Sequence, residues 1–125
     1  MAGEDSGRSG EGNGSLPREV AEGLREAGGT QGLLARIPDR DSLKELSDRH
    51  QALSDPVRLQ IVHLLGASEL CPCVLKELTG LTDSKLSYHL GILEKARLVL
   101  WRQNKNWRVY RLTELGRSYL DGSPI

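Results

Sequence analysis

Two amphipathic segments joined by a very short turn constrain the fold of this chain more than any other feature. The first runs from Glu69 to Leu78 and is expected to be a helix that is closed by Gly80. The second begins at Thr82, a typical N-cap residue. Apolar residues recur at helical spacing in both segments, as Leu70, Val74, Leu75 and Leu78 and then as Leu86, Leu90 and Leu93. Two short helices around a tight glycine turn predict a helix-turn-helix, whose second helix enters the major groove of DNA.

Two further helices are predicted upstream of this motif. The first covers residues 40–53, with Asp41 or Ser42 as its N-cap. Leu43, Leu46, His50 and Leu53 recur in it at helical spacing. The second is capped by Ser54 or Asp55, has Pro56 at its first position and ends at Gly66. Its apolar face consists of Val57, Ile61, Leu64 and Leu65.

Downstream of the helix-turn-helix, the sequence changes from a helical to a β-prone pattern. The β-prone residues Leu98, Leu100, Val109 and Tyr110 flank a polar turn at residues 103–106. This arrangement predicts a β-hairpin with a basic tip. A last short helix is expected from Glu114 to about Leu120. The order of elements predicts a mainly α fold with a β-hairpin wing (α+β), which is the winged helix-turn-helix.

The first 38 residues lie outside this pattern. Residues 1–15 are acidic and rich in Gly and Ser, so they cannot bury enough apolar surface to offset the entropy of ordering. We predict a disordered tail there. Residues 16–38 are predicted to be an N-terminal helical extension and linker, with a helix over residues 16–28 and irregular chain from Gly29 to Pro38. Residues 39–125 are the predicted winged helix-turn-helix domain for DNA binding and dimerisation.

The location of the protein is inferred from two missing signals. No apolar run approaches the roughly 18 residues of a membrane span. The acidic, glycine-rich N-terminus lacks the apolar region of a secretory signal. We therefore expect a cytoplasmic protein without a membrane partner, in which both cysteines are normally reduced.

Charge is distributed unevenly along a chain that is neutral in total. Lys+Arg 17 equals Asp+Glu 17, so an overall basic excess is absent. The segment from Lys95 to Thr113 nevertheless holds six bases and no acid. The candidate DNA contacts are polar residues of the second helix and cations of the hairpin, namely Ser84, Lys85, Ser87, Tyr88, His89, Arg102, Lys105 and Arg108. Solvated positions of an ordinary surface helix would have the same composition, so the order of elements carries this prediction.

Other residues that could bind a ligand or a base have simpler explanations. The aromatic residues of the hairpin, Trp101, Trp107 and Tyr110, favour packing against the core over stacking on bases. His50 and His63 have no partner residue one helical turn away, so we interpret them as packing or surface residues.

The only two cysteines, Cys71 and Cys73, flank Pro72 at the start of the predicted third helix. Burial as small apolar residues is one explanation. The two residues lie at the start of the helix and not on its apolar stripe, and the positive partial charge at a helix start lowers the pKa of a thiol. This position favours a pair of thiolates that binds a thiophilic ion. A thiol redox switch is the main alternative, although a disulfide across one residue would be strained. Two further alternatives are a regulator without an effector and a small dithiol enzyme. The Cys-x-Cys spacing disfavours the enzyme, so no catalytic site is expected.

Four stretches of the chain together resemble the ArsR–SmtB family of dimeric winged-helix repressors. They are ALSDPVRLQIVHLL, ELCPCVLKEL, SKLSYHLGILEKARLV and NWRVYRLT, and they lie within residues 40–121. In arsenical-responsive members the third helix opens with a Glu-Leu-Cys-x-Cys stretch, which is matched by residues 69–73. His89 matches a histidine that is common in the family.

The resemblance implies a homodimer that binds a palindromic site in double-stranded DNA and releases it when an ion binds. Arsenite, antimonite, cadmium or lead would bind Cys71 and Cys73, and no permanent cofactor is expected. Dimer contacts would come from residues 43–53 and from the last helix, with Leu115, Tyr119 and Leu120. The chain departs from the arsenic pattern at Lys76, where a third thiolate often stands. The family's alternative zinc site needs a histidine on the last helix, and none is present there.

Overall fold

The computed structural model describes residues 15–120, and the described chain divides into two units between Asp39 and Arg40. The first unit holds α1 (Arg18–Glu26) and α2 (Gly29–Leu34). Helix α2 corrects the prediction of an irregular linker over residues 29–38. Gly28 and Gly29 have φ values of 95° and 76°, which turn the chain, and the Gly32 N–H then bonds to the Gly28 carbonyl at 3.2 Å to begin a new helix. The predicted tail at residues 1–15 lies almost wholly outside the described residues.

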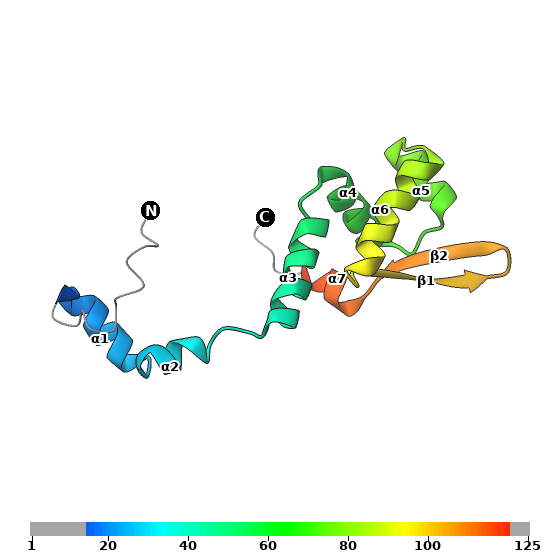
Figure 1. Ribbon diagram of the computed structural model, residues 1–125. Helices are drawn as coiled ribbons and strands as arrows, with labels where there is room; N and C mark the ends of the chain where they lie inside the picture. Colours follow the sequence, from blue (N-terminus) through cyan, green and yellow to red (C-terminus); the bar gives the residue numbers. More distant parts are fainter. Residues whose placement is uncertain (1–14, 121–125) are drawn as a thin grey trace. The chain divides into compact units, whose positions relative to one another are not determined.

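The second unit holds five helices and one hairpin within the described residues (Figure 1). The helices are α3 (Arg40–Ala52), α4 (Pro56–Ala67), α5 (Pro72–Thr79), α6 (Asp83–Lys95) and α7 (Glu114–Ser118). The strands β1 (Val99–Asn104) and β2 (Trp107–Leu112) form an antiparallel sheet. This order confirms the predicted mainly α architecture with a β-hairpin wing.

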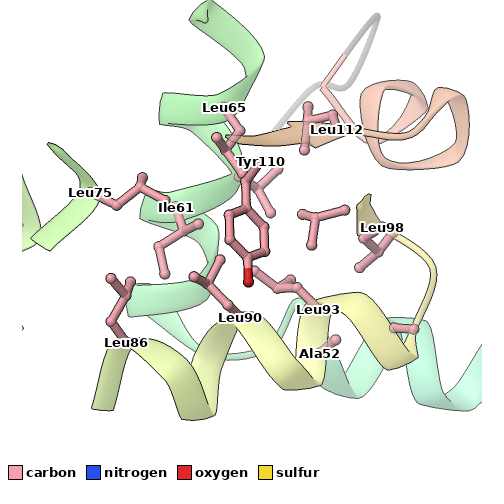
Figure 2. Packing of buried hydrophobic residues seen from close by; sticks show 13 residues of the cluster. Ala52, Ile61, Leu65, Leu75, Leu86, Leu90, Leu93, Leu98, Tyr110 and Leu112 are labelled. Carbon is pink, nitrogen blue, oxygen red and sulfur yellow. The ribbon is translucent and has the colours of Figure 1, made fainter. Parts of the chain in front are cut away.

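One core joins the helix-turn-helix to the hairpin (Figure 2). Helix α4 contributes Ile61 and Leu65, and the second hairpin strand contributes Tyr110. Further buried residues of this core are Leu75, Leu86, Leu90, Leu93, Leu98 and Leu112. Burial of each leucine or isoleucine contributes about 1.5–3 kcal/mol, so this cluster holds α6 and the hairpin in a fixed relationship.

Local capping signals explain several helix boundaries. Asp55 Oδ1 accepts a hydrogen bond from the Val57 N–H at 2.7 Å, as an N-cap should. This hydrogen bond is the main cause that holds the pKa of Asp55 below its usual value. Gly80 closes α5 with a φ of 74°. These caps were predicted and are confirmed. The predicted N-cap of α3 at Asp41 or Ser42 is wrong, because both residues lie inside a helix that begins at Arg40, and α4 continues one residue beyond Gly66.

The start of the third helix differs from its prediction. The helix begins at Pro72 and not at Glu69, because Leu70 forms an antiparallel bridge with Tyr110 of β2. Two backbone hydrogen bonds hold this bridge, at 3.1 and 2.8 Å. The predicted stripe is also wrong at Leu78, which is 51% exposed. The segment before α5 is therefore attached to the hairpin instead of continuing the helix.

The hairpin turn is tighter than the predicted turn over residues 103–106. Gln103 pairs with Arg108 and Asn104 with Trp107, so only Lys105 and Asn106 connect the strands. Lys105 has a φ of 57°, which such a short connection requires of a central residue. The last helix is also shorter than expected and ends at Ser118.

Candidate DNA interface and thiol pair

Helix α6 buries one face and exposes the other. Leu86, Leu90 and Leu93 point into the core, which leaves the opposite face in solvent. Four of the predicted DNA contacts are exposed in the N-terminal half of the helix, namely Ser84, Lys85, Ser87 and Tyr88. Tyr88 is 63% exposed. Hydroxyl and ammonium donors in this position can reach base edges and phosphates in a major groove.

Contacts across the turn fix the start of α6 relative to α5. The Thr82 hydroxyl accepts a hydrogen bond from the Lys85 N–H at 3.2 Å and caps the helix, as predicted. Lys76 Nζ of α5 lies 3.1 Å from Asp83 Oδ1 in the first turn of α6. A displacement of α5 would therefore reach the DNA-facing end of α6 through this ion pair as well as through the core.

His89 does not share the exposed face of its neighbours. It is half-buried, and Arg58 of α4 donates a hydrogen bond from Nη1 to His89 Nδ1 at 3.1 Å. The ring of Tyr88 packs edge-on against it, with centroids 5.2 Å apart. His89 therefore joins α6 to α4 through Nδ1, and Nε2 is the ring nitrogen that remains for a DNA contact.

Arg58 is a residue that sequence reasoning missed. Only 8% of it is exposed, and its Nε donates to the Ala52 carbonyl of α3 at 2.8 Å. A second guanidinium nitrogen lies 3.5 Å from the Gln51 carbonyl, so Arg58 binds the C-terminal carbonyls of α3. The sequence did contain a signal that Arg58 is buried, namely its helical spacing, because Arg58 shares one face of α4 with the buried Ile61, Val62 and Leu65.

The three predicted cations of the wing differ in their surroundings. Arg102 Nη1 donates to Glu69 Oε1 at 2.7 Å. The Arg108 guanidinium lies over the Trp101 ring, 3.9 Å from its centroid. Lys105 occupies the two-residue turn at the tip and is exposed. The structure thus brings Arg102 to the segment that precedes the cysteines.

The aromatic residues of the hairpin mostly pack as predicted. Tyr110 is buried in the core, and Trp101 is packed against that core. Their ring centroids are 6.4 Å apart. Trp107 departs from the prediction, because it is 55% exposed near the tip. The reason is its pairing with Asn104 next to the turn, beyond the reach of the helical core.

The two cysteines form a close pair at the start of α5. Cys71 occupies the N-cap position and Cys73 the second helical position, and their sulfur atoms are 2.9 Å apart. Cys71 is half-buried and Cys73 is exposed. The alternative of two buried apolar residues is therefore wrong. Both thiols are accessible to a ligand from solvent.

The two thiols differ in acidity because Cys73 donates a hydrogen bond that stabilises the thiolate of Cys71. The hydrogen bond from the Cys73 thiol, followed by the backbone amide of Val74, lowers the pKa of Cys71. The same hydrogen bond raises the pKa of Cys73, because the Cys73 thiol must give up the proton that it donates, and burial and the charge of the neighbouring thiolate add to this effect. Cys71 is therefore the thiol that ionises first, and a bound cation would favour ionisation of both.

Further ligands do not converge on this pair within residues 15–120. In that range, no three His, Cys, Asp or Glu side chains are grouped to hold a metal ion. Lys76, at the position of a third thiolate in the arsenic pattern, is engaged with Asp83. His50 and His63 are exposed, which confirms that they are surface residues.

Among the helices of the described residues, none is long and apolar enough to cross a membrane.

The tight helix-turn-helix, the polar face of α6 and the basic antiparallel wing define the protein as a winged helix-turn-helix DNA-binding regulator.

Comparisons with known proteins identify the family. Residues 55–100 match the model described as "Bacterial regulatory protein, arsR family". The chain is 40% identical over 80 residues to the "Arsenical resistance operon repressor" of Staphylococcus xylosus, across 64% of this chain and 77% of the relative. The protein of that name from Bacillus subtilis (strain 168) is 37% identical over 73 residues, across 58% and 70% of the two chains. The chain belongs to the ArsR family, as the sequence motifs predicted.

Solved structures agree with this assignment. The homodimeric winged helix-turn-helix DNA-binding domain of Mb0332 from Mycobacterium bovis superimposes with a TM-score of 0.60 at 27% identity, covering 69% of this chain and 82% of that one. The transcriptional repressor BigR from Xylella fastidiosa gives a TM-score of 0.55 at 32% identity, covering 64% and 79%. The family and these relatives are DNA-binding regulators, so the protein is a regulator and not an enzyme.

Proposed function

We propose that the protein is a homodimeric transcriptional repressor that leaves its operator when a thiophilic metal or metalloid ion binds Cys71 and Cys73. The observation that carries this proposal is the 2.9 Å separation of the two sulfur atoms at the start of α5. Two thiolates this close can bind one soft ion together. The names of the relatives from Staphylococcus xylosus and Bacillus subtilis support arsenic as one candidate.

DNA would be held by α6 and the wing. Ser84, Lys85, Ser87 and Tyr88 would contact the major groove, with His89 contributing through Nε2. Arg102, Lys105 and Arg108 would contact phosphates or the adjacent minor groove. Binding that relies on these cations weakens steeply as salt is raised. A twofold dimer would require a palindromic operator.

Ligand binding would be coupled to DNA binding through α5. The thiol pair opens α5, and α5 contacts α6 through Leu75 in the core and through the Lys76–Asp83 ion pair. A coupling free energy of about 1–3 kcal/mol would reduce DNA affinity about 5–150-fold. Trivalent arsenic favours three sulfur ligands, and this chain has two cysteines. A small-molecule thiol would complete that coordination, whereas cadmium and lead could also take oxygen ligands.

A thiol redox switch is the second candidate, and the acidity of Cys71 favours it. A lowered pKa leaves more thiolate at neutral pH, and thiolates react with peroxide. The two candidates predict different triggers for the same pair of cysteines.

Fluorescence anisotropy of the reduced protein on DNA from its own promoter, without oxygen, tests both. Arsenite, antimonite, cadmium, lead and zinc are titrated in, followed by peroxide, with the Cys71→Ser/Cys73→Ser variant in parallel. Release of wild type but not of the variant by an ion supports the proposal and ranks the ions. Release by peroxide alone assigns the redox switch. A protein that binds DNA but is released by neither would retain the regulator assignment and lose the sensor site.

A further inference from the structure

The segment before the cysteines is attached to the wing at two points. The Leu70 N–H donates to the Tyr110 carbonyl at 3.1 Å, and the Tyr110 N–H donates to the Leu70 carbonyl at 2.8 Å. One residue earlier, Glu69 Oε1 accepts the 2.7 Å hydrogen bond from Arg102. Residues 69 and 70 therefore act as a short additional edge of the hairpin.

Both contacts lie within two residues of Cys71 in the chain. Cys71 follows Leu70 directly, and its own carbonyl accepts the first hydrogen bonds of α5, from Val74 and Leu75 at 3.1 Å. A change in the backbone at Cys71 must therefore alter α5, or the Leu70 bridge, or both. The core side of the bridge is rigid because Tyr110 is buried, which leaves the exposed Glu69–Arg102 pair as the part that can rearrange.

The register of the hairpin places this pair where it can act on DNA binding. Arg102 lies opposite Val109, beside the Trp101–Tyr110 pair and next to Gln103, which pairs with Arg108. Arg108 in turn covers the Trp101 ring. The Glu69 carboxylate thus holds one of the wing's cations and limits the positions of the strand that carries it.

We propose that Glu69 is a positioning residue that couples the thiol pair to the wing by holding Arg102. This inference rests on the proposed function and adds a second route of release beside α5 and α6. In the ligand-free protein, the ion pair keeps the Arg102 guanidinium in its DNA-binding arrangement. An ion on Cys71 and Cys73 draws the backbone of residues 69–71 toward the ligand, separates the pair and displaces β1.

The chain contains its own reporter for this movement. Its two tryptophans, Trp101 and Trp107, both lie in the wing. A Trp107→Phe background leaves Trp101, the neighbour of Arg102, as the sole source of tryptophan fluorescence. Cadmium is the probe, because occupancy of the thiols can be followed separately by the ultraviolet absorption of the cadmium–thiolate bond.

The experiment compares Glu69→Gln, Arg102→Gln and the double variant with Glu77→Gln, a control that neutralises an exposed carboxylate of α5. Circular dichroism and cadmium affinity establish that each variant is folded and still binds the ion. In the parent and in Glu77→Gln, we expect cadmium to change Trp101 fluorescence and to reduce DNA affinity. In Glu69→Gln we expect a smaller fluorescence change. The cadmium response, defined as the ratio of the DNA Kd with cadmium to the Kd without it, should be smaller by about threefold to fivefold, which is the most that an exposed ion pair contributes.

The double variant identifies the pair as the cause. If Glu69 acts through Arg102, the cadmium response of the double variant equals that of either single variant. Occupied thiols with an unchanged fluorescence response in Glu69→Gln would overturn this inference and leave the proposed function intact. Thiols that fail to bind cadmium, arsenite or antimonite in the parent protein would overturn both.

Discussion

The guanidinium of Arg58 donates a hydrogen bond to Nδ1 of His89, 3.1 Å away, and so joins α4 to the helix predicted to read DNA. Arg58 also binds the carbonyl groups that end α3. One buried side chain therefore sets the relative positions of three helices. Because Nδ1 accepts this hydrogen bond, the imidazole proton of neutral His89 lies on Nε2.

Loss of Arg58 should destabilise the fold. In Arg58→Ala, the Ala52 carbonyl and His89 Nδ1 lose their donor, and we expect the free energy of unfolding to fall by about 2–4 kcal/mol. Urea denaturation at a fixed protein concentration measures this change. Arg111→Ala, which removes an exposed arginine of β2, should change stability by less than about 0.5 kcal/mol. Equal effects of the two substitutions would show that Arg58 does not organise the helices.

Two glycines should respond to alanine in opposite directions. A Cβ at Gly116 of α7 would collide with the Leu98 carbonyl, so Gly116→Ala should cost about 1–3 kcal/mol. Gly91 lies inside α6, and within the described chain no atom beyond its chain neighbours and the backbone of the adjacent helical turns lies within 4 Å of a Cβ placed there. Gly91→Ala should therefore stabilise the helix by about 0.5–1 kcal/mol. Thermal unfolding followed by circular dichroism tests both, and a lower melting temperature for Gly91→Ala would contradict the geometry of α6.

The two thiols should react with iodoacetamide over different ranges of pH. The thiolate is the reactive form, and the pKa of Cys71 is lowered by Cys73 and Val74. As pH falls, alkylation of Cys71 should persist below the pH at which Cys73 has stopped reacting, because the pKa of Cys73 is raised. Peptide mass spectrometry after timed alkylation gives both profiles.

The control for this profile is Cys73→Ala, which removes the supporting thiol. The midpoint for Cys71 should then move to higher pH, toward that of an ordinary cysteine. An unchanged midpoint would assign the acidity of Cys71 to the helix start alone.

Lys85 should contribute to DNA binding through charge. We expect Lys85→Gln to weaken binding to specific and random DNA alike and to reduce the slope of log affinity against log salt by about 1. Anisotropy titrations at several salt concentrations measure the slope. Lys44→Gln is the matched control, because Lys44 lies on α3 and pairs with Asp48 at 3.1 Å. A slope that falls equally in both variants would exclude a specific phosphate contact at Lys85.

The exposed leucines of α3 should form the contact between two copies of the chain. Leu43 and Leu46 are 42% and 37% exposed on a helix that buries only Ala52 within one chain. A charge there would have to be buried in the dimer, so Leu43→Glu/Leu46→Glu should produce a monomer in sedimentation velocity. Leu78→Glu, on the exposed side of α5, should leave the dimer unchanged. A dimer that survives the α3 substitutions would place the interface elsewhere.

Sequence reasoning succeeded where the determinants are local. Asp55 and Thr82 cap the starts of helices through their side chains, and Gly80 ends a helix through its backbone freedom, so their roles can be read from neighbouring residues. The inner faces of α4 and α6 follow the helical period for the same reason. The order of the predicted elements indicated the winged helix, and the family motifs then identified the class of protein.

The predictions failed where contacts join distant parts of the chain. Leu70 carries a helical spacing, yet its backbone pairs with Tyr110, and no local feature indicates that pairing. Arg58 appears as an ordinary charged helix residue until α3 and α6 enclose it. Glu69 was included in the motif that identified the thiol pair, but its bond to Arg102 depends on the folded position of the wing.

The ion pair between Lys76 and Asp83 bears on how this protein can evolve. A third sulfur ligand at position 76 would suit trivalent arsenic, but the same substitution would remove the ion pair between α5 and the first turn of the DNA-reading helix and leave only their contact in the core. A lineage that gained the ligand would have to restore the link elsewhere or tolerate a weaker hold on its operator. If the protein senses arsenic as proposed, selection for a stronger response and selection for tight repression oppose each other at this one residue.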